Sequence, residues 1–268
     1  ADPYVVPALI DTITTDQYQY KYLEETTYTN SAGTIAEGGT YGESALAFTE
    51  RTENIRKVGA FIPMTDELLA DVSAAQGYID SRLRLMVRSA ISDQILDGSG
   101  SGSALTGILN KSGINTFDYS SFSGNLKRIG QVFEAITEIQ KDAYMNPDAI
   151  IMNPADWYQV VTEVNAVTTS GSLNPLFVGA GGFGENALPR LWGVPVVVSK
   201  EIDASGTALV GVFGGGQAIH IVARQGMEVT MSDSHDENFV KDIVVMKASV
   251  RMGLPIYRAT AFCSITNF

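Results

Sequence analysis

The chain has 268 residues, of which 45% are hydrophobic and 18% charged, enough to bury a sizeable core in one large domain or in two intertwined ones. Its formal net charge is −12, from 30 acidic and 18 basic residues. This charge disfavours tight sequence-independent binding of nucleic acid, although it does not exclude a local basic face. No apolar run approaches the ~20 residues that span a bilayer, and the first residues lack the basic start and apolar centre of a signal peptide, so we expect no membrane segment.

The beginning of the chain predicts an arm followed by a long hairpin. Residues 1–16 carry two prolines and no helical period, which indicates an extended arm. Beyond Gln17, tyrosines at alternate positions predict one strand, and a second strand is expected over 45–62. The segment "NSAGTIAEGGTYGES" between them is far longer than a tight turn. Because an isolated two-stranded hairpin is marginal in water, we expect contacts outside the hairpin to support it.

A helical period begins at Thr65, the expected N-cap, and continues to about Leu96. At ~1.5 Å per residue this single helix would be almost 50 Å long, so we interpret it as a spine. Its apolar residues recur at three- and four-residue steps: Leu68, Leu69, Val72, Ala75, Ile79, Leu83, Met86, Val87, Ala90 and Ile91.

Two further helices and several short strands follow the spine. One helix is expected over 125–143, and "NPADWYQVV" predicts another, with Asn153 as its N-cap and Pro154 at its first position. A long glycine-rich loop covers 168–189. Helices and strands do not alternate regularly, so the predicted class is α+β with a mixed or antiparallel sheet. The strands are expected over 194–199, 208–213, 218–223, 227–232 and 243–252.

The stretch "LDGSGSGSALTGIL" (96–109) raises the question of a phosphate-binding loop. Such a loop presents glycine amides at the N-terminus of a helix. Gly98, Gly100 and Gly102 instead follow the C-terminus of the predicted spine, and no Lys-Ser or Lys-Thr pair comes after them. We therefore interpret this stretch as a flexible loop that ends the helix.

The best candidate for a metal site is an acidic loop that contains Asp233, His235, Asp236 and Glu237. The other histidine, His220, lies in a strand-like segment, so no second imidazole stands at a ligand spacing. We expect this loop to face water and to hold no metal ion.

The sequence carries no catalytic signature, because it lacks a G-x-S-x-G motif and groups no base or acid around a nucleophile. The single cysteine, Cys263, lies in the apolar run "ATAFCSI" and is expected in the core, in a chain suited to a reducing compartment. The adjacent carboxylates Glu24 and Glu25 are explained by solvation. We expect no enzyme, no cofactor and no metal.

Six stretches in this order resemble the major capsid proteins of tailed bacteriophages, which have the Hong Kong 97-type fold, and the resemblance covers nearly the whole chain. None of the stretches is diagnostic alone; their order and spacing carry the resemblance. They are "KVGAFIPMTDELLAD" (57–71), "ILDGSGSGSALTGIL" (95–109), "DAIIMNPADWYQV" (148–160), "PRLWGVPVVVSK" (189–200), "ALVGVFGGGQAIHIVARQGMEV" (208–229) and "VRMGLPIYRATAF" (250–262).

The resemblance implies five parts of the chain. They are an N-terminal arm (1–16), an extended hairpin loop lying over a neighbouring subunit (17–62), a peripheral domain with the spine helix (63–145), an axial domain whose loop near 168–189 points at the five- and six-fold axes (146–235), and a return strand of the peripheral domain (236–268).

The resemblance also implies a structural role. Family members assemble through pentamers and hexamers into an icosahedral shell around phage double-stranded DNA, which they contact weakly and without sequence preference. The implied partners are other copies of the chain, a scaffolding protein or segment, a maturation protease, the portal and a decoration protein, in a virion assembled in the host cytoplasm. The resemblance favours a mature chain, and Ala1 fits either cleavage of a leader or loss of the initiator Met.

Some family members crosslink their subunits through a lysine in the extended loop and an asparagine elsewhere. Here no lysine lies between Tyr22 and Arg56, and Lys21 and Lys57 flank the hairpin at its base. We therefore predict a non-covalent shell.

The residues expected at subunit contacts lie in the hairpin and in the glycine loop. Charges near the hairpin base are expected to pair with Arg82, Arg84 or Arg88 in a neighbour's spine, although solvated charges worth under ~1 kcal/mol each explain any one pair equally well. Glu37 and Glu43 at the tip are further ion-pair partners. The full set is Gly33, Glu37, Gly38, Gly39, Glu43, Arg51, Glu53, Arg56, Gly98, Gly100 and Gly102.

Two alternatives stay open. An encapsulin would build a smaller shell on the same fold and hold an enzyme in place of DNA. A metal-binding or ligand-binding α+β protein would use Asp233, His235 and Asp236 and would not form large particles.

Overall fold

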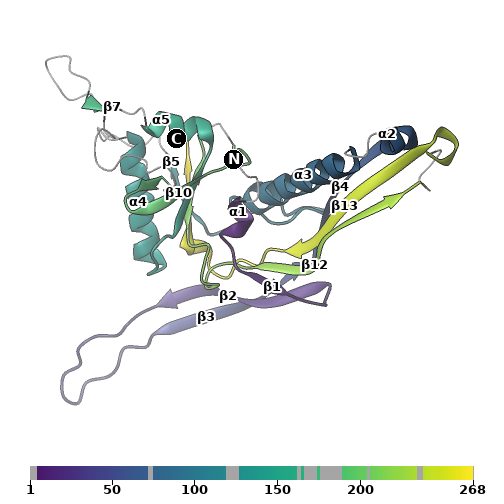
Figure 1. The fold of residues 1–268 in the computed structure, drawn as a ribbon. Helices are drawn as coiled ribbons and strands as arrows, with labels where there is room; N and C mark the ends of the chain where they lie inside the picture. The colour runs from purple at the N-terminus through teal and green to yellow at the C-terminus, as the bar shows by residue number, and fades with distance from the viewer. Residues whose placement is uncertain are drawn as a thin grey trace.

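Two sheets, the helices packed on them and a projecting hairpin make up the molecule (Figure 1). Helices and strands both contribute, so the predicted α+β class is confirmed. The computed structural model describes residues 5–71, 75–118, 127–161, 164–165, 174–175, 189–203, 206–233 and 238–267.

The first sheet has the strand order β1-β12-β13-β4 and carries the spine helix on one face (Figure 1). β13 is antiparallel to β12 and β4, whereas β1 is parallel to β12. Along β13, Met246 and Ala248 are buried and Lys247 between them is exposed, as expected for a strand with one face on a helix. The strands are β1 (Thr12–Thr14), β4 (Arg56–Thr65), β12 (Ile221–Ser232) and β13 (Ile243–Gly253).

The spine consists of α2 (Asp66–Asp71) and α3 (Ala75–Asp97), and residues 72–74 between them lie outside the described part of the chain. Its start and end agree with the prediction to within about one residue. α3 buries Leu83 and Val87 and packs against β4 and β13. The predicted stripe is confirmed at Leu83, Val87 and Ile91, which are buried, and is wrong at Leu68 and Met86, which are 43% and 47% exposed.

The second sheet has the order β5-β14-β11-β6-β10-β9 and is mixed. β11 is antiparallel to β14 and β6, whereas β10 is parallel to β6 and β14 is parallel to β5. The helix α4 (Lys127–Asp142) packs against β5, β11 and β14. The strands are β5 (Asn115–Asp118), β6 (Ala149–Met152), β9 (Arg190–Leu191), β10 (Val194–Val198), β11 (Ala208–Gly211) and β14 (Phe262–Thr266).

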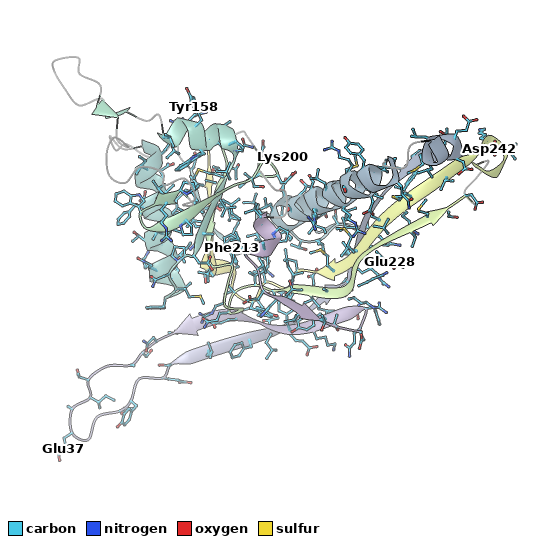
Figure 2. All side chains as sticks on the ribbon, in the orientation of Figure 1. Glu37, Tyr158, Lys200, Phe213, Glu228 and Asp242 are labelled. Atoms are coloured by element: carbon cyan, nitrogen blue, oxygen red, sulfur yellow. The ribbon has the colours of Figure 1, made fainter. Side chains whose placement is uncertain are left out.

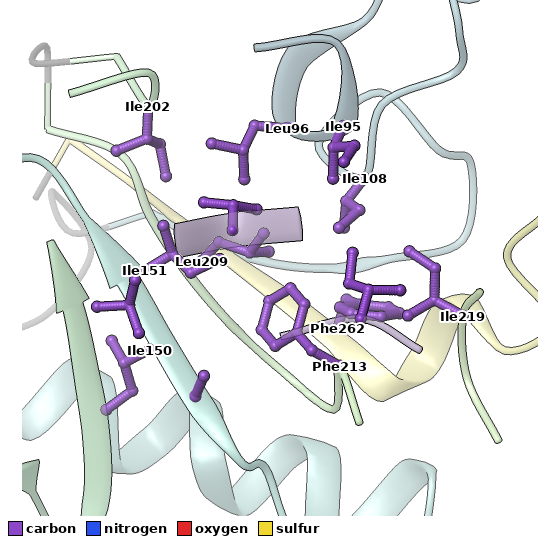
Figure 3. Close-up of a cluster of buried hydrophobic side chains, with 14 of the residues drawn as sticks. Ile95, Leu96, Ile108, Ile150, Ile151, Ile202, Leu209, Phe213, Ile219 and Phe262 are labelled. Carbon is purple, nitrogen blue, oxygen red and sulfur yellow. The ribbon is translucent and has the colours of Figure 1, made fainter. Parts of the chain in front are cut away.

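A continuous cluster of buried side chains joins the spine to the second sheet. Leu96 at the end of α3 and Ile108 after it lie beside Leu209, Phe213 and Phe262 (Figure 3). The rings of Phe213 and Phe262 meet edge to face with centroids 5.4 Å apart. The two sheets therefore share one core.

The local helix-start signal at Asn153 is confirmed by α5 (Pro154–Val161). The amide N–H of Ala155 donates to Asn153 Oδ1 at 3.0 Å, and Asn153 Nδ2 donates to the carbonyl of Ile202 at 2.9 Å. The cap thus also ties the helix to the turn after β10. Smaller elements are β7 (Val164–Asn165), β8 (Asn174–Pro175) and the 3₁₀ helices η2 (Asn238–Lys241) and η3 (Ala259–Ala261). Apart from β8 and residue 189, the loop predicted over 168–189 lies outside the described residues.

The prediction of a wholly extended arm is wrong at residues 5–8, which form the short helix α1 (Val5–Ala8). Val6 and Pro7 are buried, and α1 packs against α3. A proline in the first turn of a helix loses no hydrogen bond there, so Pro7 does not oppose this helix. Burial against the spine decides the local structure.

The hairpin consists of β2 (Gln19–Thr29) and β3 (Ala45–Asn54), which pair antiparallel. The prediction of one strand over 45–62 is wrong, because the chain leaves the hairpin at Ile55 and continues as β4 in the first sheet. The hairpin therefore ends at Asn54 and not at residue 62.

The two strands predicted over 218–223 and 227–232 are also corrected, because β12 runs without interruption from Ile221 to Ser232. Its pairing with β13 shifts between Ala223 and Glu228, and such an irregularity breaks the alternation of the sequence without ending the strand. The division into arm, hairpin loop, peripheral domain and axial domain stays a prediction.

Candidate assembly interface

The hairpin tip carries the glycines and glutamates that were predicted to contact a neighbour. Glu37 lies at the far end of the hairpin, away from both sheets (Figure 2). The N–H of Gly39 donates to the carbonyl three residues earlier at 2.8 Å, and Gly38 has a φ of +78°, which glycine adopts without strain. Gly33 and Glu43 are exposed as well. The tip thus presents these residues to solvent in the single chain, and their contact with a neighbour stays a prediction.

Large apolar side chains lie exposed along the hairpin strands. Leu23 is 59% exposed, Leu46 55% and Phe48 54%. Leu23 and Phe48 also line a cavity of about 280 Å³ that reaches Tyr257 in the body. Adjoining exposed apolar groups on a projecting element are typical of a protein contact surface. We name the exposed side chains Leu23, Leu46 and Phe48 the apolar strip of the hairpin.

The root of the hairpin contains a charge cluster around the buried carboxylate of Glu24, which the sequence did not predict. Glu24 Oε1 lies 2.8 Å from Lys111 Nζ, and Glu24 Oε2 lies 2.7 Å from Arg51 Nε. The side chains of Glu24 and Lys111 are only 9% and 13% exposed. Burial disfavours the charged carboxylate, but the hydrogen bonds from Lys111 and Arg51 prevail and hold the pKa of Glu24 below its ordinary value. The expectation that Glu24 is merely solvated is wrong.

Glu25 makes a second connection between the hairpin and the body. Its carboxylate accepts from Arg258 Nη2 at 2.7 Å and from Arg258 Nε at 3.1 Å, and its backbone N–H donates to the carbonyl of Tyr257 at 3.3 Å. Tyr22 packs edge to face on Tyr257 with centroids 5.3 Å apart. Glu25 is thus paired as well, and not solvated as predicted. The alternation of tyrosines in the sequence places Tyr22 and Glu24 on the same face of the strand. This pattern does not reveal which residues they contact.

The predicted charges at the hairpin base have contacts within their own chain. Arg51 pairs with Glu24, as described above. Burial raises the pKa of Glu53 to about 7, against the opposing effects of the Leu254 N–H and nearby positive charges. Arg56 begins β4 opposite Met252.

The spine arginines, which were predicted to pair with a neighbouring subunit, lie on the surface or pair within the helix. Arg84 Nε pairs with Asp80 one helical turn away at 2.9 Å, whereas Arg82 and Arg88 are exposed. A contact between this helix and the hairpin base of a neighbour would compete with pairs already formed within each chain. Such a contact stays a prediction.

The glycine stretch after α3 is a closed, hydrogen-bonded turn and not the flexible loop that was predicted. The N–H of Gly107 donates to the carbonyl of Gly98, and the N–H of Gly100 donates to that of Leu105, each at 2.8 Å. A Cβ on Gly98 would overlap the carbonyl oxygen of Leu105, and Gly100 and Gly102 have φ values of +69° and +60°. The glycines therefore allow close approach of the backbone, and Gly98 follows a helix C-terminus, which does not favour a phosphate.

Lys111 is positioned by the chain that follows this glycine turn. Ile108 N–H donates to the carbonyl of Ile95 at 2.8 Å, and Asn110 Nδ2 donates to Asp97 Oδ1 at 2.9 Å. Since both acceptors belong to the last turn of α3, Lys111 is fixed relative to the spine.

The candidate metal loop gains no support from the described residues. Asp233 is exposed at the end of β12, and His235, Asp236 and Glu237 lie outside the described part of the chain. Among the described residues no group of three His, Cys, Asp or Glu side chains could hold a metal ion. Cys263 is buried, and burial raises the pKa of its thiol to about 12, so it is a core residue as predicted.

No helix within the described ranges combines the length and apolar character that crossing a membrane requires.

Solved structures of particle-forming proteins share this fold over almost the whole chain. The capsid of a native GTA particle aligns with a TM-score of 0.74 at 16% identity, covering 98% of this chain and 90% of that chain. Microbacterium phage Oxtober96 gives 0.73 at 13% identity, with 98% and 90% covered. A virus-like particle from Pyrococcus furiosus gives 0.63 at 12%, with 97% and 91% covered. At such identities the likeness shows the fold alone, which is that of Hong Kong 97-type capsid proteins.

The sequence itself gives the family. The phage capsid family model matches residues 5–267, and the chain belongs to this family. The chain is 29% identical over 241 residues to the major capsid protein of Enterobacteria phage HK97, covering 90% of this chain and 59% of that protein. This chain thus spans about three fifths of the length of that relative. The resemblance found in the sequence is confirmed.

Proposed function

We propose that this chain is a structural major capsid protein that assembles with its own copies, through pentamers and hexamers, into an icosahedral shell around double-stranded DNA. The observation that carries the proposal is the projecting hairpin with its apolar strip, on a chain of the phage capsid family. Leu23, Leu46 and Phe48 are too exposed to stabilise a single chain, whereas a neighbouring subunit would bury them.

The same proposal includes partners and location. A scaffolding protein or segment, a maturation protease, a portal and a decoration protein would act on or join the shell, which would form in the host cytoplasm and end in the virion. With a net charge of −12 the chain would contact packaged DNA weakly and without sequence preference.

We further propose a shell without covalent crosslinks. Lys21 pairs with Glu50 at 2.8 Å on the hairpin, and Lys57 lies in β4, so neither is carried by the tip. Mature particles boiled in denaturant should run as single subunits on a gel. A ladder of multimers would show that lysines outside the tip form crosslinks.

The test of the main proposal is electron microscopy of the purified full chain together with its mass by light scattering. Closed shells, with genome-length DNA in particles from the native source, would support a virion capsid. Shells filled with an enzyme would favour the encapsulin alternative. A small species that never assembles would refute both the virion capsid and the encapsulin, and would favour the metal-binding alternative that uses Asp233.

A further inference from the structure

Two chain crossings join the hairpin to the body, one before β2 and one at Ile55, between β3 and β4. At the second crossing, Ile55 N–H donates to the carbonyl of Tyr18 at 3.0 Å and closes the end of the hairpin itself. Such a root would let a two-stranded ribbon swing relative to the body. Contacts at the root, from side chains and from the backbone of β2, must therefore set the direction of the hairpin.

We infer that the direction of the hairpin is set within each subunit by the Glu24–Lys111 ion pair, which links the hairpin to the turn after the spine helix. Glu24 and Lys111 are positioning residues in this sense, and the function of that positioning rests on the proposed assembly.

The two cations of the cluster have different roles. Arg51 stands opposite Tyr22 across the hairpin, so its bond to Glu24 lies inside the hairpin and cannot orient it. Lys111 belongs to the body and is fixed by the turn bonded to the last turn of α3. The bond from Lys111 to Glu24 is therefore the member of the cluster that transmits orientation.

Because it is mostly buried, the Glu24–Lys111 pair should have a larger effect on the orientation of the hairpin than the exposed Lys21–Glu50 pair. Lys21 and Glu50 meet at the same 2.8 Å distance, but their side chains are 69% and 59% exposed, against 13% and 9% for Lys111 and Glu24. An exposed pair is screened by water and contributes little, whereas a pair whose side chains are mostly buried is screened much less. The chain thus supplies its own matched control.

A second contact fixes the rotation of the strand. Adjacent residues of a strand point to opposite faces, so Glu24 and Glu25 hold β2 from its two sides, through Lys111 and Arg258. The backbone bond from Glu25 to Tyr257 holds the edge between them. Because the hairpin is oriented before it meets a neighbour, docking loses less conformational entropy than it would with a swinging ribbon.

The experiment measures the distance between the tip and the body by paired spin labels. Labels are placed at Tyr41→Cys and Glu134→Cys, both at exposed positions, while native Cys263 is buried and stays unlabelled. The labelled full chain is diluted with unlabelled protein so that only distances within one chain contribute. The unmodified root should give one narrow distance distribution.

Lys111→Met should broaden this distribution about twofold or more, since it removes the charge and keeps the aliphatic stem. Lys111→Arg should keep it narrow. Arg51→Gln, which leaves the Lys111 bond in place, and the exposed Lys21→Met should also leave it narrow. Thermal melting of each variant identifies any that fail to fold, and Glu24→Gln then repeats the test from the other partner.

A narrow distribution in both Lys111→Met and Glu24→Gln would overturn the inference. Particle yield is scored in parallel, and we expect a loss of closed shells of about tenfold in Lys111→Met. Broad distances with normal shells would overturn the role of orientation in assembly. Distances that behave as expected in a protein that never forms shells would leave the inference standing and refute the proposed function.

Discussion

The hairpin and the second sheet show two ways in which this chain holds strands together. The strands of the second sheet are covered by α4 and the end of the spine, and Ile150, Ile151 and Leu209 are fully buried. β3 pairs with β2 alone, and nearly all of its residues are exposed. The second sheet depends on apolar burial inside the subunit, whereas the hairpin depends on its root and, in our proposal, on neighbouring subunits. Stability and assembly should therefore respond to different residues.

The largest effect should come from the shared core. Phe213→Ala removes a fully buried ring that packs on Phe262, so the free energy of unfolding should fall by about 3–5 kcal/mol. Phe48→Ala on the exposed hairpin should change it by less than about 0.5 kcal/mol, while lowering the yield of shells. Denaturant unfolding of subunits and microscopy of particles measure the two quantities. Equal losses of stability would mean that the hairpin has a core of its own.

A smaller loss is expected from the glycine turn. Gly98→Ala places a Cβ against the carbonyls of Leu105 and Gln94, which are backbone atoms and must shift, so the expected loss is about 2 kcal/mol. Gly33→Ala at the hairpin tip meets nothing within 4 Å and should be neutral within about 0.5 kcal/mol. Melting curves of the two variants compare a turn inside the body with a turn outside it. A neutral Gly98→Ala would show that the turn can relax.

A pH-dependent effect is expected at Glu53, at the boundary of the two regions. The shift of its pKa converts to about 3 kcal/mol, and because the side chain is only partly buried we expect about 2 kcal/mol. Burial raises its pKa from 4.5 to about 7, so between these values the folded chain holds a proton that the unfolded chain has released. Stability from this group is therefore present below pH 4.5 and is lost as the pH rises through 7.

Glu53→Gln should remove this dependence. The variant should be more stable than the unmodified chain at pH 8 and similar to it at pH 4.5, as measured by urea unfolding across this range. The exposed tip variant Glu43→Gln serves as the control and should follow the unmodified pH profile. A constant difference between Glu53→Gln and the unmodified chain at all pH values would contradict the prediction.

The smallest effect is expected from the exposed pair of the hairpin. Lys21→Met should leave the melting temperature unchanged within error, because the side chains of the Lys21–Glu50 pair are largely exposed to water. Raising the salt concentration should not separate the variant from the unmodified chain. A clear loss would mean that the hairpin depends on pairs along its length and not only on its root.

The sequence predicted the elements whose signals are local. Asn153 and Pro154 mark the start of α5 by chemistry that needs no partner, and the structure has the helix there. The spine was predicted from its three- and four-residue period, which Leu83, Val87 and Ile91 confirm by their burial. These features depend on residues a few positions apart.

The features that the sequence did not predict depend on contacts between residues far apart along the chain. Nothing around Ile55 marks the end of β3, since only the pairing of β4 with β13 ends it. Lys111 lies 87 positions beyond Glu24, so their ion pair follows from the fold and not from spacing. Val6 forms a helix because the spine is beside it, although its own segment favours extension.

The continuity of β3 with β4 through Ile55 has a mechanical consequence. A pull on β3 from outside the subunit is carried along the chain into β4, which is joined to β13 over all ten of its residues (Figure 1). The bonds of an antiparallel pair stand across the strands, so a force directed along β4 loads them together and does not open them one by one. In the proposed shell, tension on this connection would therefore spread along β4 and β13, and swelling of the particle would strain the first sheet before it tore the hairpin loose.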